Sequence, residues 1–400
     1  GVQTCALPIS GALMQIVAQG SQDAYLTAKP EVTFFKFIYK RYTNFAMEAM
    51  EQTLSGTANF GNKVVCKVSR NGDLMGPCYV ETTLPSIALS ESDNWVGRVG
   101  FRLLKSVEFR VGGQQIDRHY STWMHCWTEL THTTDQKALL DKLVGAKGTD
   151  GAVVADAAVD TTTLHIPLLF SFCRNPGLAV PLIALQYHDI ELHIEFETLA
   201  RCMNDNTTSQ TGSLSNTSLW VDYIFLDAEE RREFAANPHE YLIETVQTQE
   251  ATLNGSSINS VRLTFNHPTK ELVWVCRDSS PTGDAFTDFR GAGTDTNSLV
   301  TGKLKLNGQD RFTQRVGDYF NYVQPYQHHT GKPDVGINSY SFALKPEEHQ
   351  PSGTVNFSRI DNINLDITPN DNSCTELHVM AHSYNIFRVA SGMGGNAYAN

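Results

Sequence analysis

A strand-turn-strand pattern that occurs twice is the feature that most constrains the fold of this chain. Residues 104–120 hold two alternating stretches around a Gly-Gly turn, and residues 304–312 repeat the pattern loosely around Asn-Gly. Alternation of apolar and polar residues indicates strands, and glycine supplies the positive φ that a tight hairpin turn requires. A second matching pair, residues 189–194 and 362–367, lies downstream. The chain is therefore predicted to hold two similar β domains in tandem.

The number of strand-like stretches predicts the fold class. At 400 residues the chain is long enough for two domains of about 200 residues, and about eight short strands can be read in each half. This pattern favours an all-β double jelly roll, two tandem eight-stranded sandwiches or barrels with short helices in the loops. The helices are predicted at residues 123–130 and 136–144. A charged helical turn stopped by Asn237-Pro238 marks the boundary, so residues 33–236 and 237–400 are predicted as the two jelly rolls.

The two ends of the chain are expected to lie outside the barrels themselves, and the C-terminal one is a tail of the second domain. Residues 1–9 look like the in-frame translation of a sequencing-library adapter, an artefact to be excluded from fold reasoning. Residues 10–32 are predicted as an N-terminal arm that docks on another surface. The glycine-rich residues 391–397 are predicted as a C-terminal tail that orders only against a neighbour.

Composition excludes several classes of protein. With a net charge of −12, the chain lacks the basic field that would hold nucleic acid directly. No run of 18 apolar residues is present that could span a bilayer. The eight cysteines show neither metal-binding spacing nor the density of a disulfide scaffold, so most are expected to be buried thiols in a reducing compartment.

An aromatic segment near the N-terminus is the first candidate for a role in assembly. Its side chains alternate too poorly for one solvated face, so the first strand is predicted here, buried on both sides. We expect it to thread between the two domains or against a neighbouring chain. The candidate residues are Phe34, Phe35, Phe37, Tyr39 and Phe45.

A proline-rich segment near residue 350 is the second candidate. Two prolines followed by a glycine predict a rigid connector that carries charge. We expect it to act as a clamp between domains or subunits, with an ordinary surface turn as the alternative. The candidate residues are Pro346, Glu347, Glu348, Pro351 and Arg359.

Metal, cofactor and catalytic sites are not predicted. His328 and His329 with His349, or His378 with His382, could suggest metal ligands, but no carboxylate or cysteine stands at a spacing that completes a site. Packing and hydrogen bonding at domain or subunit contacts is the preferred interpretation. No nucleophile stands in the local context that catalysis needs.

Blocks along nearly the whole chain, from residue 11 onward, carry a resemblance to a known family. The longest covers residues 340–354, with the sequence YSFALKPEEHQPSGT. These blocks resemble the major capsid proteins of nucleocytoplasmic large DNA viruses; the departures are confined to the start of the chain and the variable loops. The matching blocks are residues 11–18, 25–27, 33–36, 43–48, 306–311, 322–329, 340–354 and 356–362.

The resemblance implies a structural virion protein without a cofactor or catalytic activity. Its fold would be a double jelly roll, and three chains would form a homotrimeric, pseudo-hexagonal capsomer that tiles an icosahedral shell. Its implied partners are neighbouring capsomers, minor capsid proteins, penton proteins and an inner membrane beneath the shell. Such a protein would reside in the virion and be assembled in the host cytoplasm.

Two other interpretations of the sequence remain open. One is a minor capsid protein or a receptor- or glycan-binding jelly-roll protein of the same virus class; penton proteins usually hold a single jelly roll, so the duplication argues against a penton. The other is a carbohydrate-active or cupin-like enzyme. Such an enzyme would need histidine and carboxylate ligands that converge inside one barrel, and the spacing does not supply them.

Overall fold

The computed structural model describes residues 10–86, 95–145, 162–203, 211–277, 286–291, 296–370 and 374–398. The chain divides into two compact units, Gly1–Thr43 and Asn44–Asn400. None of the helices in the described ranges is long and apolar enough to cross a membrane.

The first unit contains two short helices, α1 (Gly11–Val17) and α2 (Ala24–Thr27). The strand predicted over residues 33–39 is wrong, because this segment forms a turn and extended chain without a partner strand. Phe34 and Phe35 are 91% and 99% exposed in this unit, and their expected packing between the two domains or against a neighbouring chain stays a prediction. A strand without a neighbouring ladder leaves its backbone groups unpaired, which explains why aromatic content alone does not produce one here.

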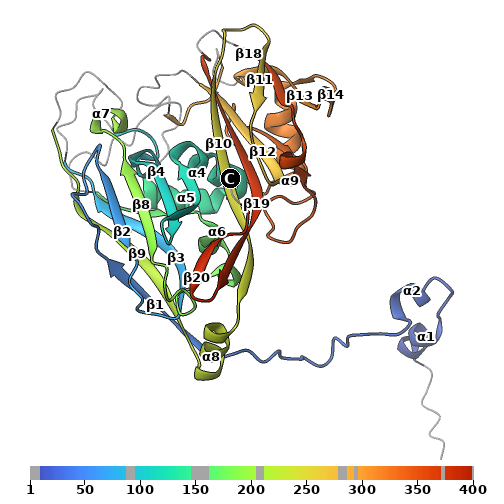
Figure 1. The fold of residues 1–400 in the computed structure, drawn as a ribbon. Coiled ribbons are helices and arrows are strands. Elements are labelled where there is room, and N and C mark those ends of the chain that lie inside the picture. Colours follow the sequence, from blue (N-terminus) through green and yellow to red (C-terminus); the bar gives the residue numbers. More distant parts are fainter. Residues whose placement is uncertain are drawn as a thin grey trace, which may run out of the picture. The chain divides into compact units, whose positions relative to one another are not determined.

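The first barrel of the second unit consists of two antiparallel sheets (Figure 1). One sheet has the order β1-β9-β3-β6 with β7 attached to β3, and the other has the order β2-β8-β4-β5. The strands are β1 (Phe45–Gln52), β2 (Lys63–Lys67), β3 (Leu74–Thr83), β4 (Leu104–Val111), β5 (Gln114–Tyr120), β6 (Thr163–Pro167), β7 (Val180–Pro181), β8 (Ile190–Phe196) and β9 (Ser215–Leu226).

The second barrel repeats this topology. Its sheets have the orders β10-β19-β12-β16, with β17 and β20 attached, and β11-β18-β13-β14, with β15 attached. We number the eight main strands of each barrel along the chain and leave out the attached strands β7, β15, β17 and β20. In both barrels, one sheet then has the order 1-8-3-6, and the other has the order 2-7-4-5. This is the jelly-roll order, so the predicted double jelly roll is confirmed. The strands are β10 (His239–Thr252), β11 (Asn259–Leu263), β12 (Pro268–Arg277), β13 (Leu299–Leu306), β14 (Gln309–Asp310), β15 (Arg315–Val316), β16 (Asn338–Ser341), β17 (Val355–Asn356), β18 (Ile363–Pro369), β19 (Glu376–Ala390) and β20 (Met393–Asn396).

The repeated sequence pattern occupies equivalent places in the two barrels. The turn between β4 and β5 has φ values of 57° at Gly112 and 81° at Gly113, and the turn between β13 and β14 has 48° at Asn307 and 78° at Gly308. Both are two-residue hairpin turns with two positive φ angles, as glycine and asparagine allow. The second matching pair corresponds to β8 and β18, the seventh strand of each barrel.

Short helices fill the connections, and those predicted near residues 123–130 and 136–144 are confirmed as α4 and α5. Residues 99–103 are also helical, residues 171–174 form α6, and residues 182–184 form a turn. The helical segments are α3 (Val99–Leu103), α4 (Ser121–Thr131), α5 (Thr134–Val144), α6 (Ser171–Arg174), η2 (Pro176–Leu178), α7 (Leu199–Cys202), α8 (Ala228–Ala236), η4 (Tyr319–Val323), α9 (Gln324–His328) and η5 (Phe357–Arg359).

The C-terminal glycines are not a free tail, which corrects the expectation from sequence. They form β20, which pairs with β19 and packs on the first barrel. A Cβ atom on Gly394 would lie 2.6 Å from Leu185 Cδ2, and one on Gly395 would lie 2.5 Å from Gln114 Oε1. The glycines therefore permit close packing, a role that composition does not distinguish from flexibility.

The central part of the sheet β10-β19-β12-β16 is buried on both faces. Along β12, Leu272 and Trp274 enter the core of the second barrel, whereas Val273 and Val275 enter the cluster that also fills the first barrel. This second face joins the two barrels into one body, and it carries most of the buried charges described next.

Candidate functional site: the seam between the barrels

We define the seam as the contact between the outer face of the sheet β10-β19-β12-β16 and the elements α4, α6 and β5 of the first barrel. Backbone and side-chain groups cross it directly. Val246 N of β10 donates to Asp117 Oδ1 of β5 at 3.1 Å. Trp123 and Trp127 of α4 place their rings 5.5 and 4.9 Å from the His382 ring of β19. The seam therefore combines aromatic packing with polar contacts.

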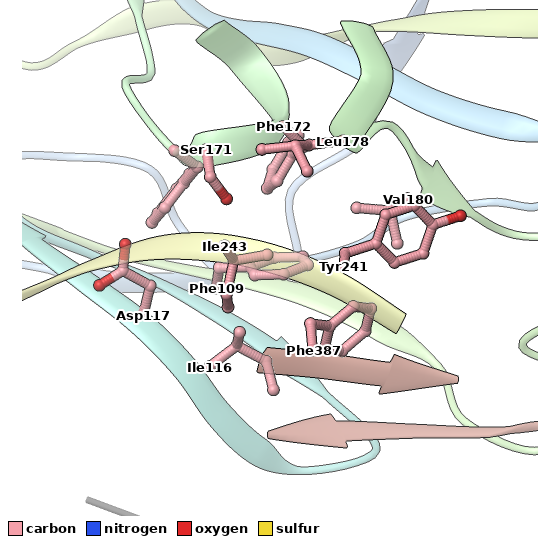
Figure 2. A pocket seen from close by; sticks show the side chains of 11 residues that line it. Phe109, Ile116, Asp117, Ser171, Phe172, Leu178, Val180, Tyr241, Ile243 and Phe387 are labelled. Atoms are coloured by element: carbon pink, nitrogen blue, oxygen red, sulfur yellow. The ribbon is translucent and has the colours of Figure 1, made fainter. Parts of the chain in front are cut away.

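One end of the seam is a small apolar pocket (Figure 2). Side chains from the two barrels face each other across it, and Asp117 and Ser171 are the polar residues in its lining. Burial of this apolar surface favours association of the barrels. The apolar side chains include Phe109, Ile116 and Phe172 from the first barrel and Tyr241, Ile243 and Phe387 from the second.

Glu244 of β10 is the centre of a buried ion network beside this pocket. Its carboxylate lies 2.7 Å from Lys270 Nζ, 3.0 Å from Arg174 Nη2 and 3.1 Å from His382 Nε2. Lys270 is the extra residue at a register shift between β12 and β19, and such a bulge redirects a side chain. Because Arg174 belongs to α6 of the first barrel, this network links the two barrels electrostatically.

A second carboxylate extends the network toward the proline-rich segment. Glu271 Oε1 lies 3.1 Å from His382 Nδ1, and Glu271 Oε2 lies 3.0 Å from His329 Nε2. The other ring nitrogen of His329 lies 3.0 Å from Glu347 Oε1. The side chains of Glu271 and His329 are fully buried, so each depends on its partners for compensation of its charge.

Burial and ion pairing act against each other on these groups. Burial would lower the pKa of His329, but Glu271 and Glu347 outweigh it and raise that pKa to about 9. Burial would raise the pKa of Glu271, but His329 and His382 hold it well below its usual value. The same balance, with His349 and His382 as the main opposing partners, lowers the pKa of Glu244. His329 is therefore a cation between two carboxylates at neutral pH.

A second charged cluster lies on the other side of α4. His125, Glu129 and Asp334 present possible ligand atoms within 4.8 Å of one another. Arg98 Nη1 lies 2.7 Å from Glu129 Oε1, and Arg98 Nε lies 3.1 Å from Asp141 Oδ1. A guanidinium group thus already supplies positive charge at the place where a metal ion would have to bind.

Residues 329–334 of the second barrel pack on the C-terminal end of α4. Gly331 N donates to Leu130 O at 2.7 Å, and Lys137 Nζ donates to Lys332 O at 2.6 Å. A Cβ atom on Gly331 would lie 2.5 Å from Leu130 O, which is closer than any side chain could approach. Glycine is therefore required for this contact between the barrels.

The charged residues predicted in the proline-rich segment differ in whether their side chains contact the seam or lie at the surface. Glu347 accepts hydrogen bonds from Thr330 N at 2.8 Å and Thr330 Oγ1 at 2.6 Å, in addition to its contact with His329. Glu348 pairs through its carboxylate with exposed Lys345, at 2.7 Å. Arg359 is exposed and forms no ion pair with any described residue. Among these charged candidates, only Glu347 brings its carboxylate into the seam network. Glu348 joins the network through its backbone carbonyl, which accepts a hydrogen bond from Lys270 Nζ at 3.2 Å.

The principal charges of the seam were not predicted from sequence; they are Arg174, Glu244, Lys270 and Glu271. The available signal was the pair Lys270-Glu271 in a strand that is otherwise apolar on both faces, because such charges require buried partners. His329 and His382 were considered as metal ligands, and the structure places both beside Glu271.

Two jelly rolls of the same topology, locked by a shared buried face, define a double jelly-roll protein. Residues 33–227 match the family described as major capsid protein N-terminus, and residues 230–395 match the family described as large eukaryotic DNA virus major capsid protein. The chain belongs to this family of major capsid proteins, as its resemblance to them predicted.

Individual relatives agree with this assignment. The major capsid protein of Pyramimonas orientalis virus is 46% identical, with 98% of this chain and 100% of the relative covered. That of Paramecium bursaria Chlorella virus 1 is 39% identical at the same coverage. The crystal structure of VP54 from the latter virus superimposes with a TM-score of 0.81 at 36% identity, covering 92% of this chain and all of VP54. The Faustovirus major capsid protein, at 14% identity, shares the fold with a TM-score of 0.72 over 93% of this chain and 94% of its own.

The ion pairs of the seam predict a defined pH dependence of stability. The pKa of His329 is raised from 6.5, so its contribution is complete below about pH 6.5 and is lost as the pH rises through 9. Glu244 and Glu271 have lowered pKa values, so their contribution is complete above about pH 4.5 and is lost on acidification. Stability should be greatest between these limits, and the His329 contribution is on the order of 3 kcal/mol.

Thermal unfolding of the wild type and of His329→Gln between pH 5 and 10 measures this effect. The wild type should lose stability between pH 7 and 9.5, whereas the variant should be less stable at pH 6.5 and should change less over the alkaline range. If the melting temperatures of the two proteins fall equally steeply as the pH rises above 7, the alkaline loss of stability does not come from His329.

Proposed function

We propose that this major capsid protein forms homotrimers of pseudo-hexagonal outline that tile an icosahedral shell. The supporting observation is that two barrels of the same topology are locked side by side in one chain. Three such chains around a threefold axis would present six similar barrels, which is the symmetry of a hexagonal tile. Relatives named as major capsid proteins over their whole length agree with this function.

The specific partners of the protein and the place of its assembly are part of the same proposal. We infer contacts with neighbouring capsomers and with minor capsid and penton proteins, a membrane beneath the shell, and assembly in the host cytoplasm before residence in the virion. We also infer that the chain has no catalytic role. Supporting this, the buried charges of the seam are paired with one another.

We further propose that the chain is divided near residue 236, between a first and a second jelly roll. The end of α8 at Ala236 and the start of β10 at His239 support this boundary. The start predicted at residue 33 is better moved to residue 44, because residues 33–43 belong to the unit of the arm.

The solution mass of the purified chain tests the trimer. We expect a stable particle near three times 44.4 kDa by light scattering or native mass spectrometry, with a hexagonal outline in electron micrographs. A monomer over the whole range of concentrations at which the shell assembles would contradict the proposal.

The arm is proposed as the element that joins one chain to its neighbour. Phe34, Phe35, Phe37 and Tyr39 are at least 79% exposed, and Phe45 at the start of β1 is 54% exposed. Residues 10–43 carry four basic and two acidic side chains, whereas the whole chain has a net charge of −12. A basic aromatic arm is therefore complementary to the acidic body of a second copy.

Removal of residues 10–43 should leave a folded body that no longer assembles. The deletion ends before β1, so the melting temperature of the monomeric body should change little, while trimer and shell formation should be lost. Electron microscopy and native mass measure assembly. Serine replacements at Phe34, Phe35, Phe37 and Tyr39 should reproduce the defect in the full-length chain. Normal trimers and shells from the truncated chain would refute the role of the arm.

The proline-rich segment is proposed as a clamp on the seam. Pro346 and Pro351 restrict the backbone, and Ser352 Oγ accepts a hydrogen bond from Lys345 N at 3.0 Å, which closes the loop. In this closed form Glu347 reaches His329, the histidine that also contacts Glu271. The clamp would hold His329 in the position where it compensates the buried carboxylate.

Glu347→Gln and Glu348→Gln form a matched pair that tests the clamp. The first removes a charge from the network and should destabilise the trimer by about 1–3 kcal/mol. The second removes an exposed surface pair and should change stability by less than about 0.5 kcal/mol. Replacement of Pro346 and Pro351 by alanine should also lower the melting temperature of the trimer. Unchanged trimer melting in the proline variant would remove the basis for the clamp.

A further inference from the structure

Cys78 and Cys173 are brought together from distant parts of the sequence. Their Sγ atoms lie 3.7 Å apart, and 95 positions separate the two residues in the chain. Both are free thiols. We propose that this pair is a disulfide-forming site, which closes when the assembled protein passes from reducing to oxidising surroundings.

The local backbone holds the two thiols in this arrangement. Cys78 lies in β3 next to a register shift relative to β9, between Met75 and Cys78. Its carbonyl oxygen accepts a hydrogen bond from Leu168 N at 3.1 Å, just before α6 begins. Cys173 N in turn donates to Phe170 O at 2.9 Å. The segment that carries Cys173 is thus tied to the backbone of Cys78, so the two sulfurs are positioned before any reaction.

The two thiols differ in solvent exposure, and this difference determines their roles in the reaction. Cys173 is partly exposed, whereas Cys78 is 3% exposed. The hydrogen bond with Cys173 and burial both raise the pKa of Cys78. Cys173 is therefore the thiol that meets a reagent, and Cys78 is the buried thiol that resolves the resulting bond.

The reaction is a thiol-disulfide exchange with a small-molecule disulfide such as oxidised glutathione. The Cys173 thiolate attacks one sulfur of the reagent, forms a mixed disulfide and releases one reduced thiol. Cys78 then loses its proton and attacks Cys173 Sγ, which breaks the mixed disulfide and releases the second reduced thiol. Two protein thiols are oxidised and one small disulfide is reduced, so atoms and electrons balance.

The position of the bond gives it a structural effect. It would join the central strand β3 to α6, and the residue after Cys173 is Arg174, which crosses the seam to Glu244. Fixing α6 would therefore hold the cation of the first barrel against the carboxylate of the second. The cross-link would also join residues 95 positions apart, which reduces the conformational freedom of the unfolded chain and so stabilises the folded state.

Other buried cysteines provide matched controls. Burial raises the pKa of the Cys66 thiol to about 11 and that of Cys202 to about 12. Both are 0% exposed, so a small disulfide in solution cannot reach them in the folded chain. Cys202→Ser should therefore leave the reaction unchanged.

The experiment treats the full-length protein with oxidised glutathione, blocks the remaining thiols with an alkylating agent and maps the peptides by mass spectrometry. We expect a peptide pair linked through Cys78 and Cys173, and a melting temperature that rises by roughly 5 °C and returns to its starting value after reduction. Cys202→Ser should behave like the wild type, whereas Cys78→Ser should stop at the glutathione adduct on Cys173.

Three outcomes would overturn the proposal. The first is a wild-type protein that stops at the glutathione adduct, which would show that Cys78 cannot reach the mixed disulfide. The second is a wild-type protein in which both cysteines remain free after oxidation. The third is a link that joins another pair of cysteines while Cys78 and Cys173 remain alkylated. Because Cys78→Ser and Cys173→Ser could alter folding, circular dichroism confirms that each variant is folded before oxidation.

Discussion

The structure depends on charges that are buried in the contact between the two barrels, and one of them, Glu244, is paired with residues from both barrels. The side chains of Glu244 and Glu271 are buried in the central part of their sheet, and Arg174 reaches Glu244 from the other barrel. A buried ion pair adds little net stability, but loss of one partner leaves an uncompensated charge at a cost of several kcal/mol. The network therefore selects one arrangement of the barrels over others that would bury the same apolar area.

Much of the fold could be predicted from sequence because the information is local. The Gly112-Gly113 and Asn307-Gly308 turns, with alternating residues on both sides, predict equivalent hairpins, and α4 and α5 follow from helical spacing. The family could also be predicted, because its matching blocks cover nearly the whole chain. These features need no knowledge of which residues meet across the molecule.

The errors and omissions concern contacts between distant residues. Phe34 and Phe35 have the composition of a strand, but no strand pairs with them, so they are exposed. The glycines of β20 have the composition of a tail, but Leu185 and the first barrel lie against them. The seam itself could not be placed, since its charges come from α6, β10, β12 and β19. For these positions tertiary context decided the outcome, and local propensity did not.

The order of strands has a consequence for synthesis. β19 lies between β10 and β12, although it is made after both, and Figure 1 shows it in red at the centre of that sheet. A nascent chain that ends before Glu376 leaves β10 and β12 without the strand that joins them. Translation must therefore pass residue 390, the end of β19, before the second barrel can close. A chain that ends before β19 lacks a completed second barrel. Such a chain is therefore kept out of the shell, where a defective subunit would weaken the assembly.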